Sequence, residues 1–126
     1  MTDSRFLTYT DIKSLPEQFK SPPHRQNVGT LLVSFDFLKK TFGDPIQLNI
    51  ENSNGKSDVE WCIWFPDEGV AVSIYNWKNG PNYCGPDGTP VHEIIEWSVA
   101  GHGPEAVLCV DRALTASREV VLSNNS

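Results

Sequence analysis

The stretch that decides the fold is "DVEWCIWFPDEGVAVSIYNW", Asp58 to Trp77. Large apolar residues recur at every second position of its first half, which is typical of a strand, and "PDEG" is a turn signal before a second strand. We therefore predict an antiparallel hairpin. Only one register keeps the apolar residues of both strands on one face, since a slip of one residue separates them. That register pairs Phe65 with Val70, Ile63 with Val72, and Trp61 with Ile74.

The other face of this hairpin is unusually aromatic. In the same register, Trp64, Tyr75 and Trp77 point away from the first apolar face. A sheet face that is simply exposed to water is mostly polar. We therefore expect this second face to be covered by the N-terminal residues, by another subunit or by a ligand. Because symmetric dimers are the commonest assemblies, we predict that Trp64, Tyr75 and Trp77 form the interface of a homo-oligomer, a dimer or larger.

The clearest helix signal lies before the hairpin. Residues 28–33 predict a short strand, and Ser34 follows as a favourable N-cap. Phe35, Leu38 and Phe42 recur at helical spacing, and Gly43 ends the helix. The segment "IQLNIENSNGKS" that follows begins as a strand and finishes as a polar loop.

A further strand and helix are predicted after the hairpin. The strand is "EIIEWSVA", residues 93–100, with Ile95, Trp97 and Val99 on its core face. "GHGPEA" then opens a helix, with Gly103 at the cap and Pro104 at the first position. The apolar stripe of this helix is Ala106, Val107, Val110 and Leu114.

These elements predict an α+β fold with two layers, in which two helices pack on one face of an antiparallel sheet. The chain has 126 residues, which fits one domain. We place this domain at residues 28–116, with an N-terminal arm at 1–27 and a C-terminal tail at 117–126. We expect the arm to be irregular and to lie over the body. Its predicted anchors are Phe6, Leu7, Tyr9, Leu15 and Phe19.

Composition excludes several classes of protein. The net charge is −6 and there is no basic run, so nucleic-acid binding is not expected. The N-terminus has no apolar core of a signal peptide, and no apolar run approaches the roughly 20 residues of a membrane span. The three cysteines, Cys62, Cys84 and Cys109, are odd in number and far apart, which favours a reduced thiol protein over a disulfide framework. We therefore expect a cytoplasmic protein that does not bind membranes.

The segment from Trp77 to Thr89 predicts a long loop without secondary structure. Such loops are uncommon in compact domains and are often functional. This one carries aromatic rings for stacking and polar groups for hydrogen bonding, which suit a planar, anionic small molecule or a partner protein. A loop packed only by its own aromatic residues is the alternative. The predicted ligand-binding residues are Trp77, Lys78, Asn79, Asn82 and Tyr83 from this loop, together with His92 and His102.

No catalytic or metal-binding set is assembled in the sequence. Cys84 lies in no nucleophile motif, although His92 and His102 are available bases. The cysteine and histidine spacings fit no zinc pattern. Glu60 and Glu96 are a carboxylate pair on the outer sheet face that ordinary pairing explains equally well. We therefore assign no catalytic residue, no metal and no cofactor. The backbone N–H groups at "GHGPEA" are a candidate anion site, weighed against an ordinary helix start.

Several motifs occur in an order that resembles a known family. They are "FGDP" after a helix, "K…EW" leading a strand (Lys56, Glu60 and Trp61), "IYNWKNGPNY" and "EWSVAGH". Together they resemble a family of small proteins of bacteriophages and other DNA viruses, over Val28 to about Leu114. The family has a histidine where this chain has Ser98, so no role is transferred to that position. The resemblance implies an accessory role, such as inhibiting a host defence system by binding a protein or sequestering a nucleotide signal.

Two functional hypotheses follow. The first is a non-enzymatic binding protein that forms a homo-oligomer and takes a nucleotide-like ligand or a host protein, in the host cytoplasm if the origin is viral. The second is a small enzyme acting on a phosphorylated or nucleotide-like substrate, with His92, His102 or Cys84 in its site.

Overall fold

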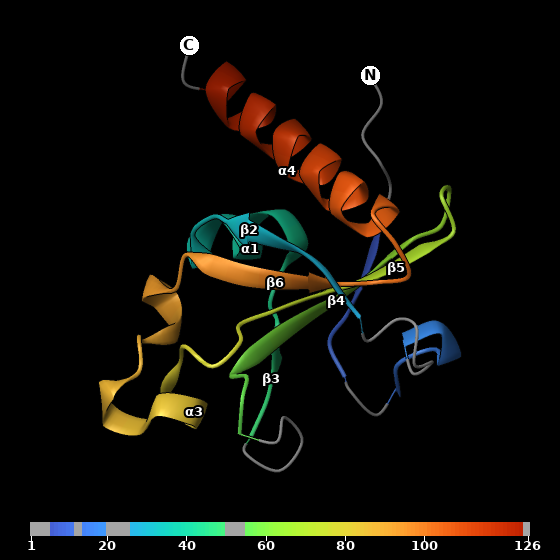
Figure 1. The fold of residues 1–126 in the computed structure, drawn as a ribbon. Coiled ribbons are helices and arrows are strands. Elements are labelled where there is room, and N and C mark those ends of the chain that lie inside the picture. Colours follow the sequence, from blue (N-terminus) through green and yellow to red (C-terminus); the bar gives the residue numbers. More distant parts are fainter. Residues whose placement is uncertain (1–5, 12–13, 20–25, 50–54, 125–126) are drawn as a thin grey trace.

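The structure is a computed structural model, and it describes residues 6–11, 14–19, 26–49 and 55–124. One sheet of six strands, all paired antiparallel, runs through these residues in the order β1-β4-β5-β6-β2, with β3 also paired to β4 (Figure 1). The strands are β1 Leu7–Tyr9, β2 Asn27–Leu32, β3 Ile46–Gln47, β4 Val59–Phe65, β5 Val70–Tyr75 and β6 Glu96–Ala100.

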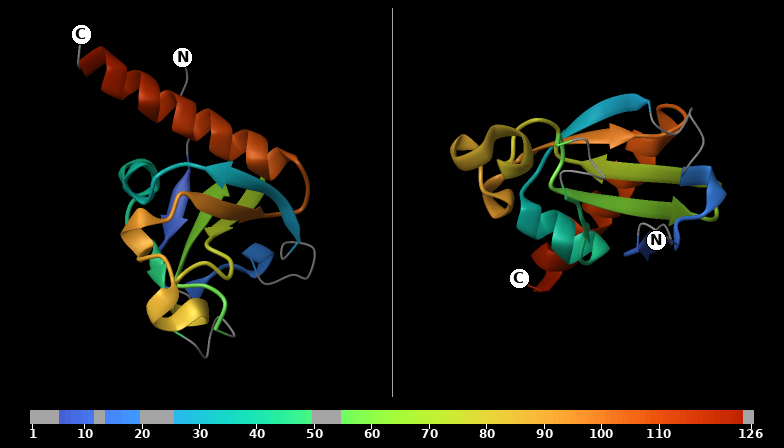
Figure 2. Two further views of the ribbon diagram at one scale, coloured as in Figure 1. Left: turned by 60° about the vertical axis from the view of Figure 1, so that its left-hand side comes forward. Right: turned by 90° about the horizontal axis from the view of Figure 1, so that it is seen from below.

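Two helices cover one face of this sheet, which confirms the predicted α+β fold. They are α1 Phe35–Phe42 and α4 Glu105–Asn124, and their apolar residues share one buried cluster with the inner face of β4, β5 and β6. Figure 2 shows α4 lying across this face, with the blue turn Glu17–Phe19 on the other side of the sheet. The shorter elements are η2 Glu17–Phe19, α3 Pro81–Cys84, η4 Gly85–Asp87 and η5 Val91–Glu93.

The predicted hairpin register is confirmed. Phe65 pairs with Val70, Ile63 with Val72 and Trp61 with Ile74 in the β4–β5 ladder. This register places the inward side chains of both strands in one buried cluster.

Helix α1 is fixed to the sheet at both ends by indole N–H groups. The Nε1–H of Trp97 donates to the Val33 carbonyl before the helix, at 2.9 Å, and that of Trp61 donates to the Gly43 carbonyl after it, at 2.8 Å. The predicted cap is present, because Ser34 Oγ accepts from the Phe37 N–H at 3.1 Å. Both tryptophans are fully buried, and a buried indole needs such a partner.

The N-terminal arm contributes a strand, which the sequence did not predict. Leu7, Thr8 and Tyr9 pair with Trp64, Ile63 and Cys62 of β4. A strand of three residues is too short to show a period. The predicted anchoring is confirmed for Phe6, which packs on the inner core, and for Tyr9, Leu15 and Phe19, which pack on the outer face of the sheet. Leu7, in contrast, is exposed.

The chain also differs from prediction after β6. Helix α4 continues to Asn124, so the structure has a helix where a tail from residue 117 was expected. Residues 115–124 contain neither glycine nor proline, so no residue there ends the helix.

The predicted inward position of Ile95 is wrong. The strand begins only at Glu96, and the preceding turn η5 shifts the alternation so that Ile94 is buried while Ile95 is exposed. Strand β5, whose last residue lies at the same end of the β5–β6 ladder, stops at Tyr75 rather than continuing to Trp77. The predicted pairing of Asp58 with Trp77 therefore lies outside the ladder.

Candidate functional site

The segment after β5 is held by a fully buried asparagine. Asn76 Oδ1 accepts hydrogen bonds from the main-chain N–H groups of Asp58, at 2.8 Å, and Val59, at 3.2 Å. Its amide nitrogen donates to Asn79 Oδ1 at 3.2 Å. The side-chain oxygen of Asn76 thus serves as acceptor for main-chain donors at the start of β4, directly after β5 ends at Tyr75.

A second asparagine fixes the start of α3. The Asn82 amide nitrogen donates to the carbonyls of Ser57, at 2.8 Å, and Leu48, at 3.1 Å. Its main-chain N–H donates to the buried Asp58 carboxylate, with distances of 3.0 and 3.2 Å to the two oxygens. These bonds satisfy groups that burial would otherwise leave unpaired.

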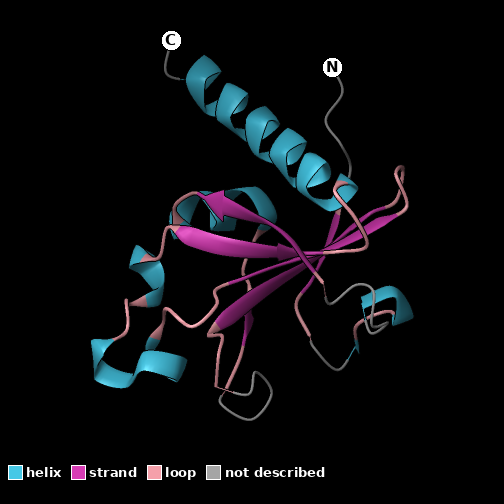
Figure 3. Cartoon of the chain, viewed as in Figure 1, coloured by secondary structure: helices cyan, strands magenta, loops and turns pink. Residues whose placement is uncertain are grey.

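Two glycines let the chain cross itself beside this carboxylate. A Cβ at Gly80 would lie 2.6 Å from Asp58 Oδ2, and one at Gly88 would lie 2.6 Å from the main chain of Gly80. Short helical turns, α3 and η4, fill the segment between them, as Figure 3 shows in cyan. The prediction of a long loop without secondary structure is therefore wrong, because each turn is only three or four residues long and has no visible period.

The predicted ligand contacts Asn79 and Asn82 are engaged inside the chain. Asn79 accepts from Asn76, and its own amide donates to the Glu96 carbonyl at 3.2 Å. The amide of Asn82 donates to two main-chain carbonyls. Both side chains therefore position the segment.

Aromatic rings and ammonium groups lie together on the exposed side of the segment after β5. We call this group the aromatic–lysine surface. It consists of Trp77, Lys78 and Tyr83 from the segment, Tyr75 from the end of β5, and Lys56 from the residues before β4. The ammonium groups of Lys56 and Lys78 lie 5.3 and 5.6 Å from the centre of the Trp77 ring, and that of Lys78 lies 5.5 Å from the Tyr83 ring. Trp77 and Tyr83 are 46% and 52% exposed, so these rings are accessible to another molecule.

Lys78 adopts an unusual backbone conformation. Its φ is 59°, and among the described residues it is the only non-glycine residue with a positive φ. Its N–H donates to the Lys56 carbonyl at 2.8 Å, and its carbonyl accepts from Cys84 Sγ at 3.4 Å. A side chain in this region costs conformational energy, which the surrounding bonds must offset.

Lys56 was not predicted as a site residue. It was used only in the "K…EW" motif and was placed in a polar loop 21 positions before Trp77. The predicted hairpin register contained a signal for it, because that register set Asp58 opposite Trp77, and Lys56 lies two residues, about 7 Å along a strand, from Asp58.

Tyr75 forms the less exposed edge of the aromatic–lysine surface. Its ring meets that of Trp77 edge to face, with centres 6.1 Å apart. Burial raises the pKa of its hydroxyl above the ordinary value of 10.0, the Glu60 carboxylate raises it further, and a hydrogen bond with Asn27 acts in the opposite direction. The hydroxyl therefore stays protonated at neutral pH.

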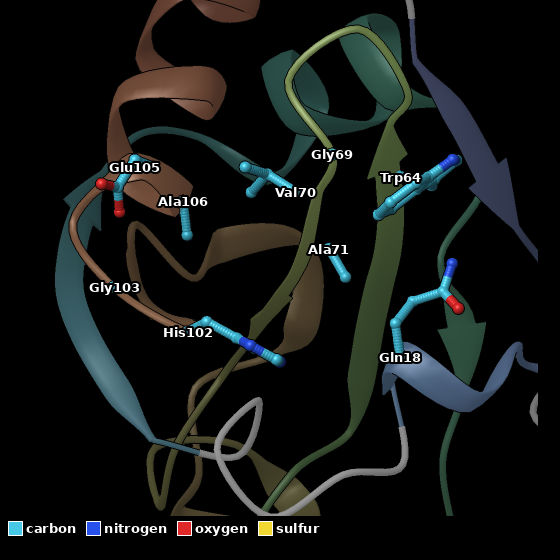
Figure 4. Close-up of a pocket in the computed structure, with 9 residues that line it drawn as sticks. All are labelled: Gln18, Trp64, Gly69, Val70, Ala71, His102, Gly103, Glu105 and Ala106. Atoms are coloured by element: carbon cyan, nitrogen blue, oxygen red, sulfur yellow. The ribbon is translucent and has the colours of Figure 1, made fainter.

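The two predicted site histidines are not part of this surface. His92 lies exposed on η5, with its Nε2 3.4 Å from a carboxylate oxygen of Glu93. His102 follows β6 and lines a hollow of about 150 Å³ near the start of β5. Figure 4 shows His102 on one side of this hollow and Trp64 and Gln18 on the other, with Ala71 between them. Six residues of extended chain, about 20 Å, separate Ala71 from Trp77.

Trp64, one of the three predicted interface residues, is partly covered within the chain. The arm covers its part of the outer face, where Cys62, Trp64 and Ala71 pack with Phe19 and Ile46. Of the three alternatives for covering this face, the structure shows the arm over β4. Tyr75 and Trp77 lie beyond that cluster.

The thiols differ in environment. Cys84 is exposed, whereas Cys62 and Cys109 are buried. Burial, and then the charge of Glu60, raises the pKa of the Cys62 thiol well above its ordinary value. Across the described ranges, no three histidine, cysteine or acidic side chains gather closely enough to hold a metal ion.

Comparison with protein-family models, with curated proteins and with solved structures finds no match to this chain. Of the helices in the described part of the chain, none has the length and apolar character needed to cross a membrane.

Proposed function

We propose that this chain is a small, non-enzymatic binding protein whose aromatic–lysine surface takes an anionic, aromatic ligand such as a nucleotide. One observation carries the proposal: two ammonium groups lie against the half-exposed ring of Trp77, with Tyr83 beside them. We further propose that it acts as a homo-oligomer in the cytoplasm, in the manner of a viral accessory protein that sequesters a nucleotide signal of the host. A protein partner with an acidic, aromatic segment is the alternative occupant.

The chemistry of the surface suits a nucleotide at two points. An exposed indole or phenol ring stacks on a base, which is worth about 1–3 kcal/mol per base. Lys56 and Lys78 supply positive charge for phosphate close to the Trp77 ring, with their ammonium groups 5.3 and 5.6 Å from its centre. Because Asn76, Asn79 and Asn82 fix the main chain beneath, little conformational entropy is lost on binding.

The net charge of −6 opposes anion binding at long range. Salt screens that repulsion beyond about 8–10 Å, whereas the lysines act at contact distance. We therefore expect measurable binding at physiological ionic strength and weaker binding in water of very low salt.

The test is calorimetry with ATP, GTP and cyclic dinucleotides on the wild type, Lys78→Ala and Tyr83→Ala. Each variant should weaken binding by roughly tenfold or more, as loss of one stacking or charged contact implies. Lys40→Ala removes an exposed lysine of α1 and is the matched control, with unchanged affinity expected. Wild-type affinity in both variants, for every nucleotide, would overturn the proposed ligand class.

A turnover assay with the same nucleotides tests the alternative, enzymatic hypothesis. No arrangement of His92, His102 and Cys84 in the described residues favours it, since His102 lies at the other end of β5 from the segment that carries Cys84. Nucleotide turnover that is lost in His92→Ala or His102→Ala would favour the enzyme instead.

A further inference from the structure

Strand β2 is an open edge of the sheet. It lies last in the strand order, and β6 is its only strand partner in the described ranges. The right-hand view of Figure 2 shows it as the outermost strand beside β6. At six residues it is longer than β1 or β3, which form the other side of the sheet with three and two residues.

The main-chain groups at this edge can be assigned from the ladder. The Val33 N–H donates to the Ile95 carbonyl at 2.9 Å, so Val33 and, by alternation, Leu31 turn their polar groups towards β6. Thr30 and Leu32 consequently turn their N–H and C=O groups away from β6, towards the open side. The bulge at the start of the strand lies between Asn27 and Gly29, and leaves this part regular.

The edge lacks the features that commonly keep strands apart. Natural edge strands carry lysine, proline or other charged residues that discourage pairing. The sequence of β2 is "NVGTLL", which has none of these, in a chain with 26 charged residues, 10 basic and 16 acidic. Leu32 is 76% exposed, and Ile95, at the same end of the β2–β6 ladder, is 63% exposed.

The inner side of this edge is already occupied. A Cβ at Gly29 would lie 2.7 Å from Val107 Cγ2 of α4, so the helix lies directly against the strand. A partner is therefore excluded from stacking on this side of β2. It must join in the plane of the sheet, through the outward main-chain groups.

We propose that β2 pairs antiparallel with β2 of a second copy of this chain, so that two sheets join into one. A second copy fits because antiparallel pairing of one strand with itself is compatible with a two-fold axis. The uncharged strand also brings no like charges together. This inference rests on the homo-oligomer part of the proposed function and not on its ligand.

The joined sheet gives the oligomer a defined shape. With the two-fold axis perpendicular to the sheet, the outer faces of both copies lie on the same side. Tyr75, Ser98 and Thr30 form one row across β5, β6 and β2 on that face. The dimer therefore presents two aromatic–lysine surfaces to one side, which suits a ligand or partner with two equivalent groups.

The first test is the mass of the full chain by sedimentation equilibrium. We expect twice 14.1 kDa for the wild type at micromolar to submillimolar concentration. Leu32→Lys should raise the dissociation constant at least tenfold. Leu7→Lys is the matched control: it makes the same change at an exposed leucine of the opposite edge, and should leave the dimer intact. Added salt should strengthen the dimer, because it screens repulsion between two copies of charge −6.

The second test needs no variant. Amide hydrogen exchange at Thr30 and Leu32 should slow as the concentration of wild-type protein rises, because their outward N–H groups become bonded to the second copy. A wild-type monomer would overturn the proposal, as would a dimer in which these two amides exchange equally fast at all concentrations. Equal dissociation of Leu32→Lys and Leu7→Lys would also overturn it. Nucleotide binding, measured by calorimetry on the same protein, does not depend on whether β2 forms a dimer. The proposed ligand and the proposed dimer can therefore be tested separately.

Discussion

Asn76 Oδ1 lies 2.8 Å from the main-chain nitrogen of Asp58, and this bond joins the end of β5 to the start of β4 within the protein interior. The same oxygen accepts from Val59 at 3.2 Å. One side chain therefore satisfies two buried donors at the point where the ladder stops. The position of the whole aromatic–lysine surface depends on it, because Trp77 and Lys78 follow directly.

Asn76→Ala should lower the free energy of unfolding by about 2–4 kcal/mol, because it leaves two buried N–H groups without an acceptor. Urea denaturation measures this loss. Gln47→Ala, at an exposed position of β3, removes a similar amide and should change stability by less than about 0.5 kcal/mol. Losses of the same size in both variants would contradict the structural role of Asn76.

Trp61 should divide its contribution between packing and one hydrogen bond. Trp61→Ala should cost about 3–5 kcal/mol, as large truncations in a core do. Trp61→Phe keeps an aromatic ring in the core but leaves the Gly43 carbonyl without its indole donor. We therefore expect a smaller loss of unfolding free energy, of which the missing hydrogen bond accounts for about 1–2 kcal/mol. Denaturation of both variants gives the comparison. A loss in Trp61→Phe as large as in Trp61→Ala would mean that the hydrogen bond dominates.

The fold was predictable from sequence where a period or a cap was strong. The alternation of Val59, Trp61 and Ile63 gave the hairpin register, and Ser34 with Gly43 gave the limits of α1. These signals succeed because burial of one face and satisfaction of helix ends are local requirements that the residues themselves must meet.

The elements that escaped prediction depend on distant partners. Strand β1 exists because β4 has an unpaired side, and three residues carry no period of their own. Asn79 and Asn82 looked like ligand contacts, since polar side chains in an expected loop have no visible partner in the sequence. Their partners, Glu96 and Ser57, lie 17 and 25 positions away.

The three thiols should separate by reactivity. One thiol per chain, that of Cys84, should react with a chromogenic disulfide reagent in the native state, and all three should react in denaturant. Cys62 and Cys109 are protected by burial, which also raises the pKa of both thiols and suppresses the reactive thiolate. Cys84→Ser should remove the native reaction. Rapid labelling of native Cys84→Ser would contradict the burial of the other two.

The raised thiol pKa of Cys62 also predicts how stability depends on alkaline pH. Above the ordinary thiol pKa of 9.0, the unfolded chain releases a proton that the folded chain retains. The folded state then binds more protons, so its stability is complete below about pH 9 and falls as the pH rises, by at most about 1.4 kcal/mol per pH unit per group. Cys62→Ala should flatten this slope in urea titrations between pH 8 and 10.5. An unchanged slope would show that Cys62 is not its source.

We expect Lys78 to lower the stability of the protein relative to glycine at the same position, and to increase its affinity for a ligand. At a φ of 59° a residue with a Cβ is strained, whereas glycine adopts this conformation freely. Lys78→Gly and Lys78→Ala both remove the ammonium group from the Trp77 and Tyr83 rings, so they lose the same contacts. The glycine variant should nevertheless be more stable than the alanine variant by about 1 kcal/mol in urea denaturation, because only alanine keeps the strain. Both variants should bind nucleotides and cyclic dinucleotides more weakly than the wild type in calorimetry. If Lys78→Gly is more stable than Lys78→Ala and both bind nucleotides more weakly than the wild type, then Lys78 contributes contacts with a ligand despite its strained backbone. If binding is unchanged in both variants, the positive φ of Lys78 is a feature of the turn alone.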